Sequence, residues 1–295
     1  MMEMTPEERR FFSWILLAIG VTAVLCNSLL IRLARRIPQR STELRFAVML
    51  ASIDMAIPTL AIGTSLLANW HADGLERLQA LCQVKGPIDF LLQYLSLLIV
   101  AIIAMERFSK VRGTQIPAMV WNLVIVYTTV YFTLVLMTAL SNEFYTSPSG
   151  CDCAPVAKTS FLSALVIFGL GFSMFLSLAI TLYCYTGILG YVRETGAKLN
   201  TTRISRSVLV RVISTCVIYL LLVSPSSILI MMEATHNSAI LDKLSLAISI
   251  LVAIIAVANP CLVLFAHSLI FEQLRLSLQS WYPPSSDSIS LHSYA

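Results

Sequence analysis

Seven long apolar stretches, separated by short polar segments, dominate the pattern of residues along the chain. Each has about 20 residues or more, the length that an α-helix needs to cross a bilayer core of roughly 30 Å. Because backbone polar groups in lipid must bond to one another, we expect every stretch to be helical. The pattern predicts an all-α membrane protein, a seven-transmembrane helix bundle. The stretches lie near 11–34, 43–69, 80–108, 117–140, 159–191, 205–233 and 242–266.

Composition excludes the main structural alternative, a soluble all-α protein with long core helices. Hydrophobic residues make up 57% and charged residues 12% of the chain, and its mean hydropathy is +0.81. A soluble domain could not cover so much apolar surface. Most of the stretches also lack the polar face of an amphipathic helix.

Charge is distributed unevenly between the loops. Cations gather beside the first, third and fifth loops, whereas the alternate loops hold acids and few cations. Basic loops stay in the cytoplasm by the positive-inside rule, so we expect an extracellular N-terminus and a cytoplasmic C-terminus. The net charge of +4 belongs to this inner face and indicates contact with the lipid bilayer rather than with nucleic acid. The inner cations are Arg32, Arg35, Arg36, Arg40, Arg45, Arg107, Lys110, Arg112, Arg193, Lys198, Arg203, Arg206 and Arg211.

The two ends of the chain differ from the spans. The polar start shows no cleavable signal peptide, so the first span should act as its own insertion signal. Residues 1–281 form the predicted transmembrane domain. Within it, residues 267–281 place apolar side chains at helical spacing, which predicts a short amphipathic eighth helix on the inner leaflet. Residues 282–295, rich in Ser and Pro, should form a disordered cytoplasmic tail.

Three of the seven cysteines lie on the predicted outer side. Cys82 starts the third span, and Cys151 and Cys153 lie in the loop before the fifth. An oxidising exterior permits a disulfide there. Cys82 can pair with either of the other two, and the sequence leaves both pairings open.

Polar residues inside the spans are the main indication of function. Asp54, Arg107 and the pair Asn259–Pro260 lie in three separate apolar stretches. An ionisable group in hydrocarbon costs roughly 2.5–3.5 kcal/mol on insertion scales, so it usually marks a functional site or a polar partner. Other characteristic positions follow in order: Asn27, Cys82 25 residues before Arg107, Glu106 and Phe108 beside Arg107, Trp121, Tyr185 and Pro225.

In combination and spacing, these residues resemble the rhodopsin-like (class A) G-protein-coupled receptors across all seven spans. Three positions depart from the family pattern. Val223 stands where a Trp is usual, Val263 where a Tyr is usual, and Ser177 where a Pro is usual. The chain therefore resembles a divergent member, and the departures concern the activation relay rather than the fold.

The resemblance implies a plasma-membrane receptor that binds an extracellular ligand and activates heterotrimeric G proteins, and that is not an enzyme. The sequence shows no Ser-His-Asp arrangement, metal-ligand cluster or Gly-rich phosphate loop. Two alternatives stay open: a small membrane transporter or channel, and a signalling-silent seven-helix protein.

The resemblance also assigns coupling roles at the inner end of the bundle. Arg107 should pair with Glu106 in the inactive state, because the sixth-span position that often supplies a second acid is Ser205. We therefore predict measurable ligand-free signalling, raised by Glu106→Gln. The residues implied in coupling and activation are Glu106, Arg107, Tyr185, Tyr219, Pro225, Asn259 and Pro260.

In the resembled family, Asp54 and Ser96 belong to a pocket for sodium and water. Two helix-seven positions that help there are Ile255 and Ala256 in this chain. A structural Na⁺ ion and a protonated or hydrated Asp54 are therefore both open, and no other cofactor is expected.

Asp89, 18 residues before Arg107, matches the position where aminergic members hold a ligand ammonium. The resemblance implies an unidentified ligand, and a cationic ligand that binds Asp89 is one of the open interpretations. A hydrated carboxylate, or one paired with Lys85 or Lys158, is the alternative. Helix periodicity adds further candidate ligand contacts at Gln93, Ser226, Ser227 and Glu233.

Overall fold

The computed structural model describes residues 6–37, 41–70, 74–146, 153–155, 160–199, 213, 216–218, 220–230, 240–266, 270 and 272–276. Its main elements are α1 (Pro6–Arg35), α2 (Thr42–Trp70), α3 (Gly74–Arg112), α4 (Ala118–Leu140), β1 (Phe144–Thr146), β2 (Cys153–Pro155), α5 (Phe161–Leu199) and α7 (Ile240–Ala266). Helical residues also occur at 216–218 and 220–230, between α5 and α7, and at 272–276 after α7.

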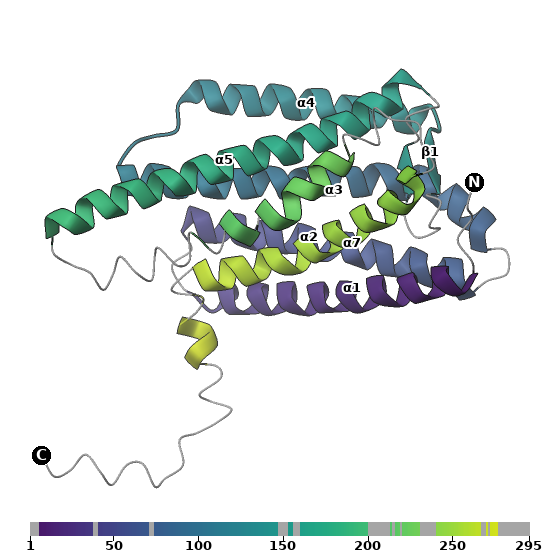
Figure 1. Ribbon diagram of the computed structural model, residues 1–295, viewed down its shortest axis with the longest axis horizontal. Coiled ribbons are helices and arrows are strands. Elements are labelled where there is room, and N and C mark those ends of the chain that lie inside the picture. The colour runs from purple at the N-terminus through teal and green to yellow at the C-terminus, as the bar shows by residue number, and fades with distance from the viewer. Residues whose placement is uncertain are drawn as a thin grey trace, which may run out of the picture.

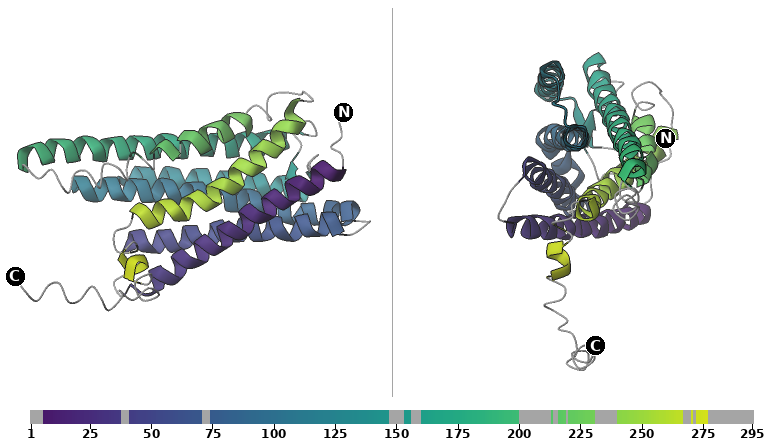
Figure 2. Two further views of the ribbon diagram at one scale, coloured as in Figure 1. Left: turned by 60° about the horizontal axis from the view of Figure 1, so that its bottom comes forward. Right: turned by 90° about the vertical axis from the view of Figure 1, so that its left-hand side faces the viewer.

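The helices lie lengthwise beside one another, and the central helix is α3 (Figures 1 and 2). It packs against α2, α4 and α5, whereas α1 packs against α2 and α7. The start of α1 and β1 lie at one end of the molecule, and the end of α7 lies toward the other (Figure 1). Because α3 packs against three other helices, a movement of any of them changes the contacts of residues on α3.

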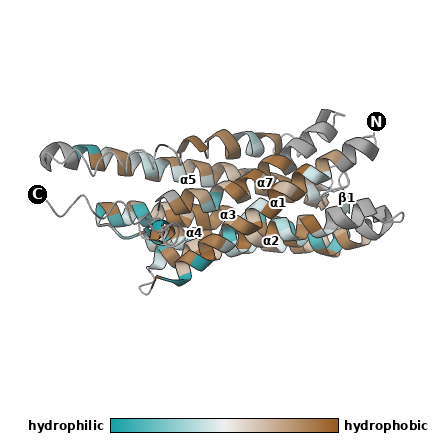
Figure 3. Ribbon diagram, turned by 90° about the horizontal axis from the view of Figure 1, so that it is seen from below, coloured by the Kyte–Doolittle hydropathy of each residue, from teal (hydrophilic) through white to brown (hydrophobic). Residues whose placement is uncertain are grey.

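Within the described residues, five helices are long and apolar enough to cross a membrane: Phe11–Arg35, Thr42–Gly63, Ala80–Arg112, Ala118–Leu140 and Phe161–Glu194. Hydrophobic residues run along these helices, as Figure 3 shows. Many of them face outward, as a lipid-facing surface requires. The prediction of a helical membrane protein is confirmed to this extent. The apolar helices in the last two predicted spans are shorter, Cys216–Ile230 and Ile250–Leu264, so the complete seven-helix bundle stays a prediction.

Helical residues 272–276 lie where the eighth helix is predicted. Ile270 is fully buried, while Leu276 is exposed. Most of the predicted eighth helix and the whole tail 282–295 fall outside the described residues, so both stay predictions.

The ends of α2 and α3 are set by short local signals. The backbone N–H of Leu44 donates to Ser41 Oγ at 3.2 Å, which caps the start of α2. Glu43 lies in this first turn, where a negative charge is favoured by the helix dipole. After α3, Gly113 adopts a φ of 66°, a left-handed conformation that favours glycine and ends helices.

A short antiparallel hairpin of β1 and β2 covers the first part of α3, with Phe144 opposite Pro155 and Thr146 opposite Cys153. Phe144 is fully buried against α3. A Cβ atom at Gly86 would lie 2.3 Å from its ring, so the close approach depends on glycine. Gln83 Nε2 donates to the carbonyl of Phe144 at 2.6 Å, which ties the hairpin to the helix.

A disulfide joins the same hairpin covalently to α3. Cys82 of α3 bonds to Cys153 of β2, with their Cα atoms 5.1 Å apart and both residues buried. The predicted disulfide is confirmed, and of the two open pairings the structure contains the one with Cys153. Cys151 lies outside the described residues.

We expect Cys82→Ala to lower the free energy of unfolding by about 4 kcal/mol, because the bridge closes a loop with a sequence separation of 71 residues. Thermal unfolding of the purified chain in detergent measures the loss. Cys151→Ala is the matched control and should unfold like the parent. An equal loss in both variants would show that Cys151 also contributes to the covalent link.

Candidate functional site

A buried polar cluster joins α2, α3 and α7 halfway along the helices. Asp54 is 1% exposed. Its Oδ1 accepts a hydrogen bond from Ser96 Oγ at 2.6 Å, and its Oδ2 accepts one from Asn259 Nδ2 at 2.8 Å. Buried polar groups are tolerated when they are hydrogen-bonded, so this cluster holds three helices together without an uncompensated acceptor on Asp54.

Asn27 extends the polar contacts to α1. It is fully buried, and its Nδ2 donates to the carbonyl of Ala23 at 2.9 Å and to that of Ala256 at 3.1 Å. The second bond links α1 to α7, next to the turn of α7 that carries Asn259. Interhelical bonds of this kind are a common way to fix helices in a membrane.

The same cluster is where a sodium ion is predicted. Asp54 and Ser96 offer oxygen atoms, but Asn259 presents its NH₂ group, and not its oxygen, to the carboxylate. Hard cations such as Mg²⁺ take about six oxygen ligands. The described residues also form no group of three or more His, Cys, Asp or Glu that could hold a metal. This donor set fits a hydrogen-bonded carboxylate better than a bound cation, and the Na⁺ ion stays a prediction.

Nearer the hairpin, α3 carries a buried ion pair. Lys85 Nζ lies 2.7 Å from Asp89 Oδ2, one helical turn away. Both residues are buried, at 6% and 7% exposure. Of the alternatives that the sequence leaves open for Asp89, the structure therefore shows the pairing with Lys85. A cationic ligand at Asp89 would have to compete with this ammonium group.

The other predicted ligand contacts are only partly free to bind. Gln93 lies one turn beyond Asp89 on α3 and is half-buried. Ser226 and Ser227 are buried and donate to carbonyls of their own helix, those of Leu222 at 2.7 Å and Ser224 at 2.9 Å. The ligand-binding roles of these residues and of Asp89 stay predictions, and Glu233 and Lys158 lie outside the described residues.

At the opposite end of α3, side chains from two other helices hold Arg107. Its Nη2 lies 2.5 Å from Glu43 Oε1, and its Nε donates to the same oxygen at 2.6 Å. Its Nη1 donates to the hydroxyl of Tyr185 on α5 at 2.9 Å. The two ionic side chains are only 16% and 18% exposed, so the pair is poorly screened by water. Arg107 thus links α3 to the start of α2 and to α5.

Close packing of α3 against α5 supports this arrangement. A Cβ atom at Gly187 would lie 2.4 Å from the ring of Phe108, so glycine lets the two helices approach. Further along the helices, Ser177 Oγ donates to the carbonyl of Leu97 at 2.9 Å. Ser177 stands where the family usually has Pro, and here its hydroxyl supplies a direct bond between α5 and α3.

The predicted pairing of Arg107 with Glu106 is wrong for this structure. Glu106 Oε1 instead lies 2.8 Å from Lys110 Nζ, one turn further along α3, and the Lys110 side chain is 51% exposed. Adjacent residues on a helix point about 100° apart, whereas residues four apart share a face. Helix geometry therefore favours Lys110 as the partner of Glu106, and leaves Arg107 to contact other helices.

Residues 26–262 match the protein family described as 7 transmembrane receptor (rhodopsin family). This match spans most of the chain and includes Asp54, Arg107 and Asn259. The chain belongs to this family of receptors. It is accordingly a multi-pass membrane protein of the G-protein-coupled receptor type, in a family whose members are typically not enzymes. A search of curated proteins finds no match to the chain.

Sequence reasoning missed one residue of the receptor's site, Glu43. A signal was present, because Glu43 is a lone acid close to the five arginines that flank the first loop. Of the remaining predicted coupling residues, Asn259 and Pro260 are buried in α7, and Pro225 is exposed within helical residues 220–230. Tyr219 and Ser205 lie outside the described residues, and the coupling roles stay predictions.

Proposed function

We propose that this receptor binds an extracellular ligand, crosses the plasma membrane with seven helices and activates heterotrimeric G proteins at its inner end. The observation that carries the proposal is the position of Arg107. Its guanidinium contacts two other helices, α2 through Glu43 and α5 through Tyr185. A shift of either helix changes the contacts of Arg107 and hence its availability to a partner protein.

The route from ligand to Arg107 runs along α3. The Lys85–Asp89 pair, Ser96 and Arg107 all lie on this helix, in that order. At 1.5 Å per residue, Asp89 and Arg107 are about 27 Å apart along the axis. A ligand that binds better to one position of α3 relative to α2 and α5 shifts the receptor toward that position. The contacts of Arg107 then change, although the ligand itself does not touch Arg107.

The buried ion pair on α3 bears on the chemistry of the ligand. We infer that a cationic group of the ligand binds Asp89, with Gln93, Ser226 and Ser227 as further contacts. Such a group displaces Lys85 from the carboxylate. A ligand that also carries an acidic group can pair with the released ammonium, so no buried charge is left alone. A zwitterionic ligand therefore fits this end of α3 better than a simple amine.

Nucleotide exchange on a panel of purified G proteins tests the proposal, with the receptor in lipid nanodiscs and candidate amines and zwitterions added in turn. Ligand-dependent exchange with one G-protein subtype is the expected result. Flux of the same compounds into liposomes that contain the receptor would instead indicate a transporter. Absence of exchange and flux, with the compounds still binding, would indicate a signalling-silent protein.

We expect an epitope placed before Met1 to be accessible to antibody on intact cells, and an epitope after Ala295 to be accessible only after permeabilisation. The physical reason is the excess of arginine and lysine in the first, third and fifth loops. Flow cytometry on the two tagged chains measures this. The reverse accessibility would place the Arg107 end of α3 outside the cell and would contradict G-protein coupling there.

A further inference from the structure

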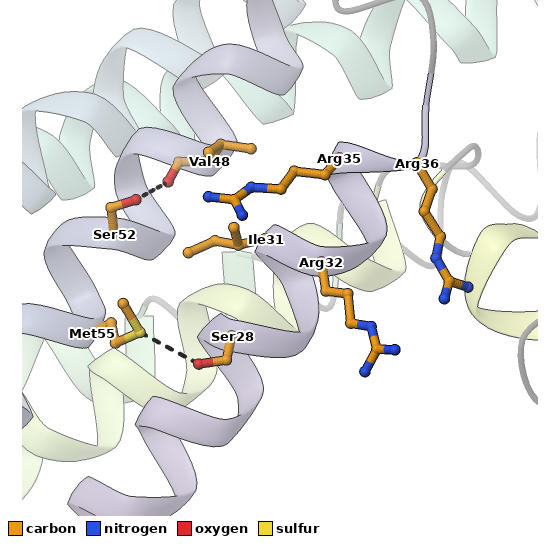
Figure 4. Close-up of a pocket in the computed structure, with 8 residues that line it drawn as sticks. All are labelled: Ser28, Ile31, Arg32, Arg35, Arg36, Val48, Ser52 and Met55. Carbon is orange, nitrogen blue, oxygen red and sulfur yellow. Dashed lines mark hydrogen bonds between the residues drawn. The ribbon is translucent and has the colours of Figure 1, made fainter.

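A cleft of about 600 Å³ opens between α1 and α2, and the residues that line it are not those of the polar cluster or the ion pairs described above (Figure 4). Arg32, Arg35 and Arg36 line one end of it, at the end of α1. Ile31, Val48 and Met55 form walls further along the two helices. The cleft therefore has one basic end and one apolar part.

The basic end holds two exposed guanidinium groups, those of Arg32 and Arg35. Arg32 and Arg35 are exposed, and within the described part of the chain neither has an ion-pair partner. The acid at the start of α2, Glu43, is already engaged with Arg107. Figure 4 shows Arg35 reaching from α1 toward Val48 of α2, while Arg32, three residues earlier on α1, extends in another direction. The two guanidinium groups line the same cleft and together offer several donors to phosphate groups.

The apolar part lies within the membrane-spanning segments. Ser28 is seven residues before Arg35 on α1, which places it about 10 Å along the helix toward the bilayer centre. The hydroxyls here are already engaged: Ser28 Oγ donates to Met55 Sδ at 3.4 Å, and Ser52 Oγ donates to the carbonyl of Val48 at 2.9 Å. The walls thus present mainly hydrocarbon, which suits an acyl chain and not a water-soluble anion.

We propose that this cleft binds an anionic phospholipid of the inner leaflet, with its phosphate groups against Arg32 and Arg35 and an acyl chain along Val48 and Met55. Arg36 adds a third positive charge at the rim. Basic pockets between membrane helices on the cytoplasmic side are suited to anionic headgroups. Only the choice of leaflet rests on the proposed topology; the selectivity for an anionic lipid follows from the residues of the cleft.

Fluorescence titrations of the purified full-length chain in detergent test this proposal. The probes are short-chain phosphatidylinositol bisphosphate, short-chain phosphatidylcholine and free inositol trisphosphate. We expect the anionic lipid to bind at least about tenfold more tightly than either of the other two, because only it combines a headgroup of net negative charge with acyl chains. The double variant Arg32→Gln/Arg35→Gln should lose that difference.

Two further variants separate the parts of the cleft. Arg112→Gln/Arg193→Gln removes the same charge from α3 and α5, and should bind the anionic lipid like the parent. Val48→Trp fills the apolar part and should weaken lipid binding about tenfold. The thermal midpoint of each variant, which should match the parent, verifies folding; if Val48→Trp fails, Ser52→Leu narrows the same wall.

Three results would overturn the proposal. Equal binding of phosphatidylcholine would make the cleft an unselective apolar groove. Binding of inositol trisphosphate as tight as that of the lipid, insensitive to Val48→Trp, would make it a site for a soluble phosphate. An equal loss in both arginine pairs would show that diffuse surface charge, and not this cleft, attracts the lipid. None of these outcomes depends on ligand binding or on G-protein coupling.

Discussion

Lys85→Met should lower the free energy of unfolding by about 3–5 kcal/mol. The substitution keeps most of the side-chain volume but leaves Asp89 buried without the cation that lies 2.7 Å from it. Removal of one partner of a buried ion pair is strongly destabilising, because the remaining charge has lost both water and its counter-charge. The midpoint of thermal unfolding in detergent should fall on the order of 10 °C.

The same helix provides a matched control. Lys110→Met removes a lysine with the same four-residue spacing to its acid, but the Lys110 side chain is 51% exposed. An exposed pair contributes about 0–1 kcal/mol, so this variant should unfold within a few degrees of the parent. The double variant Lys85→Met/Asp89→Leu should recover most of the stability, since no buried charge remains. A double variant no more stable than Lys85→Met would show that packing, and not charge, dominates at this site.

Glu43→Gln should raise ligand-free G-protein activation about tenfold. The loss of one charge-assisted contact to Arg107 is worth about 1.5–3 kcal/mol when the groups are largely withdrawn from water. That energy favours the conformation in which α2 and α5 hold Arg107, so its loss raises the population of receptors with Arg107 released. Nucleotide exchange at equal receptor concentration measures the change, and Arg107→Ala should abolish exchange in either background.

Glu106→Gln is the control for this second prediction. Glu106 contacts Lys110 and not Arg107, so its substitution should change ligand-free exchange by less than about twofold. The sequence alone predicts that Glu106→Gln raises ligand-free signalling. The contacts in the structure assign this effect to Glu43→Gln instead. A rise in Glu106→Gln with no rise in Glu43→Gln would show that the neighbouring acid restrains Arg107 in the resting receptor.

The helical architecture and the residues of the polar cluster could be predicted because both depend on local sequence. An apolar run long enough to span lipid has no stable alternative to a helix. Asp54 and Asn259 stand out as polar residues within apolar spans. The free-energy cost of placing them in hydrocarbon requires that they have hydrogen-bond partners. Ser96 was implied only by the resemblance to the receptor family, at a position 11 residues before Arg107. The structure joins these three residues directly, as their buried polar character requires.

The partner of Arg107 and the burial of the charged pairs could not be predicted without the tertiary structure. The four-residue spacing favours Lys85 as the partner of Asp89, but only the structure shows that this pair is buried, whereas Lys110 is exposed. The choice between Cys151 and Cys153 depends on the register of that hairpin, a contact between strands outside the helices.

By itself, the sequence determined the class of protein, the positions of most helices and the identity of the buried polar residues, since each follows from the cost of polar groups in lipid. The tertiary structure decided which charges meet. Arg107 finds Glu43, 64 positions away in the chain, because capping by Ser41 and packing of α2 on α3 bring the start of one helix to the end of the other. Such contacts depend on where helices end in space, and no local sequence pattern encodes the distance between the ends of two helices.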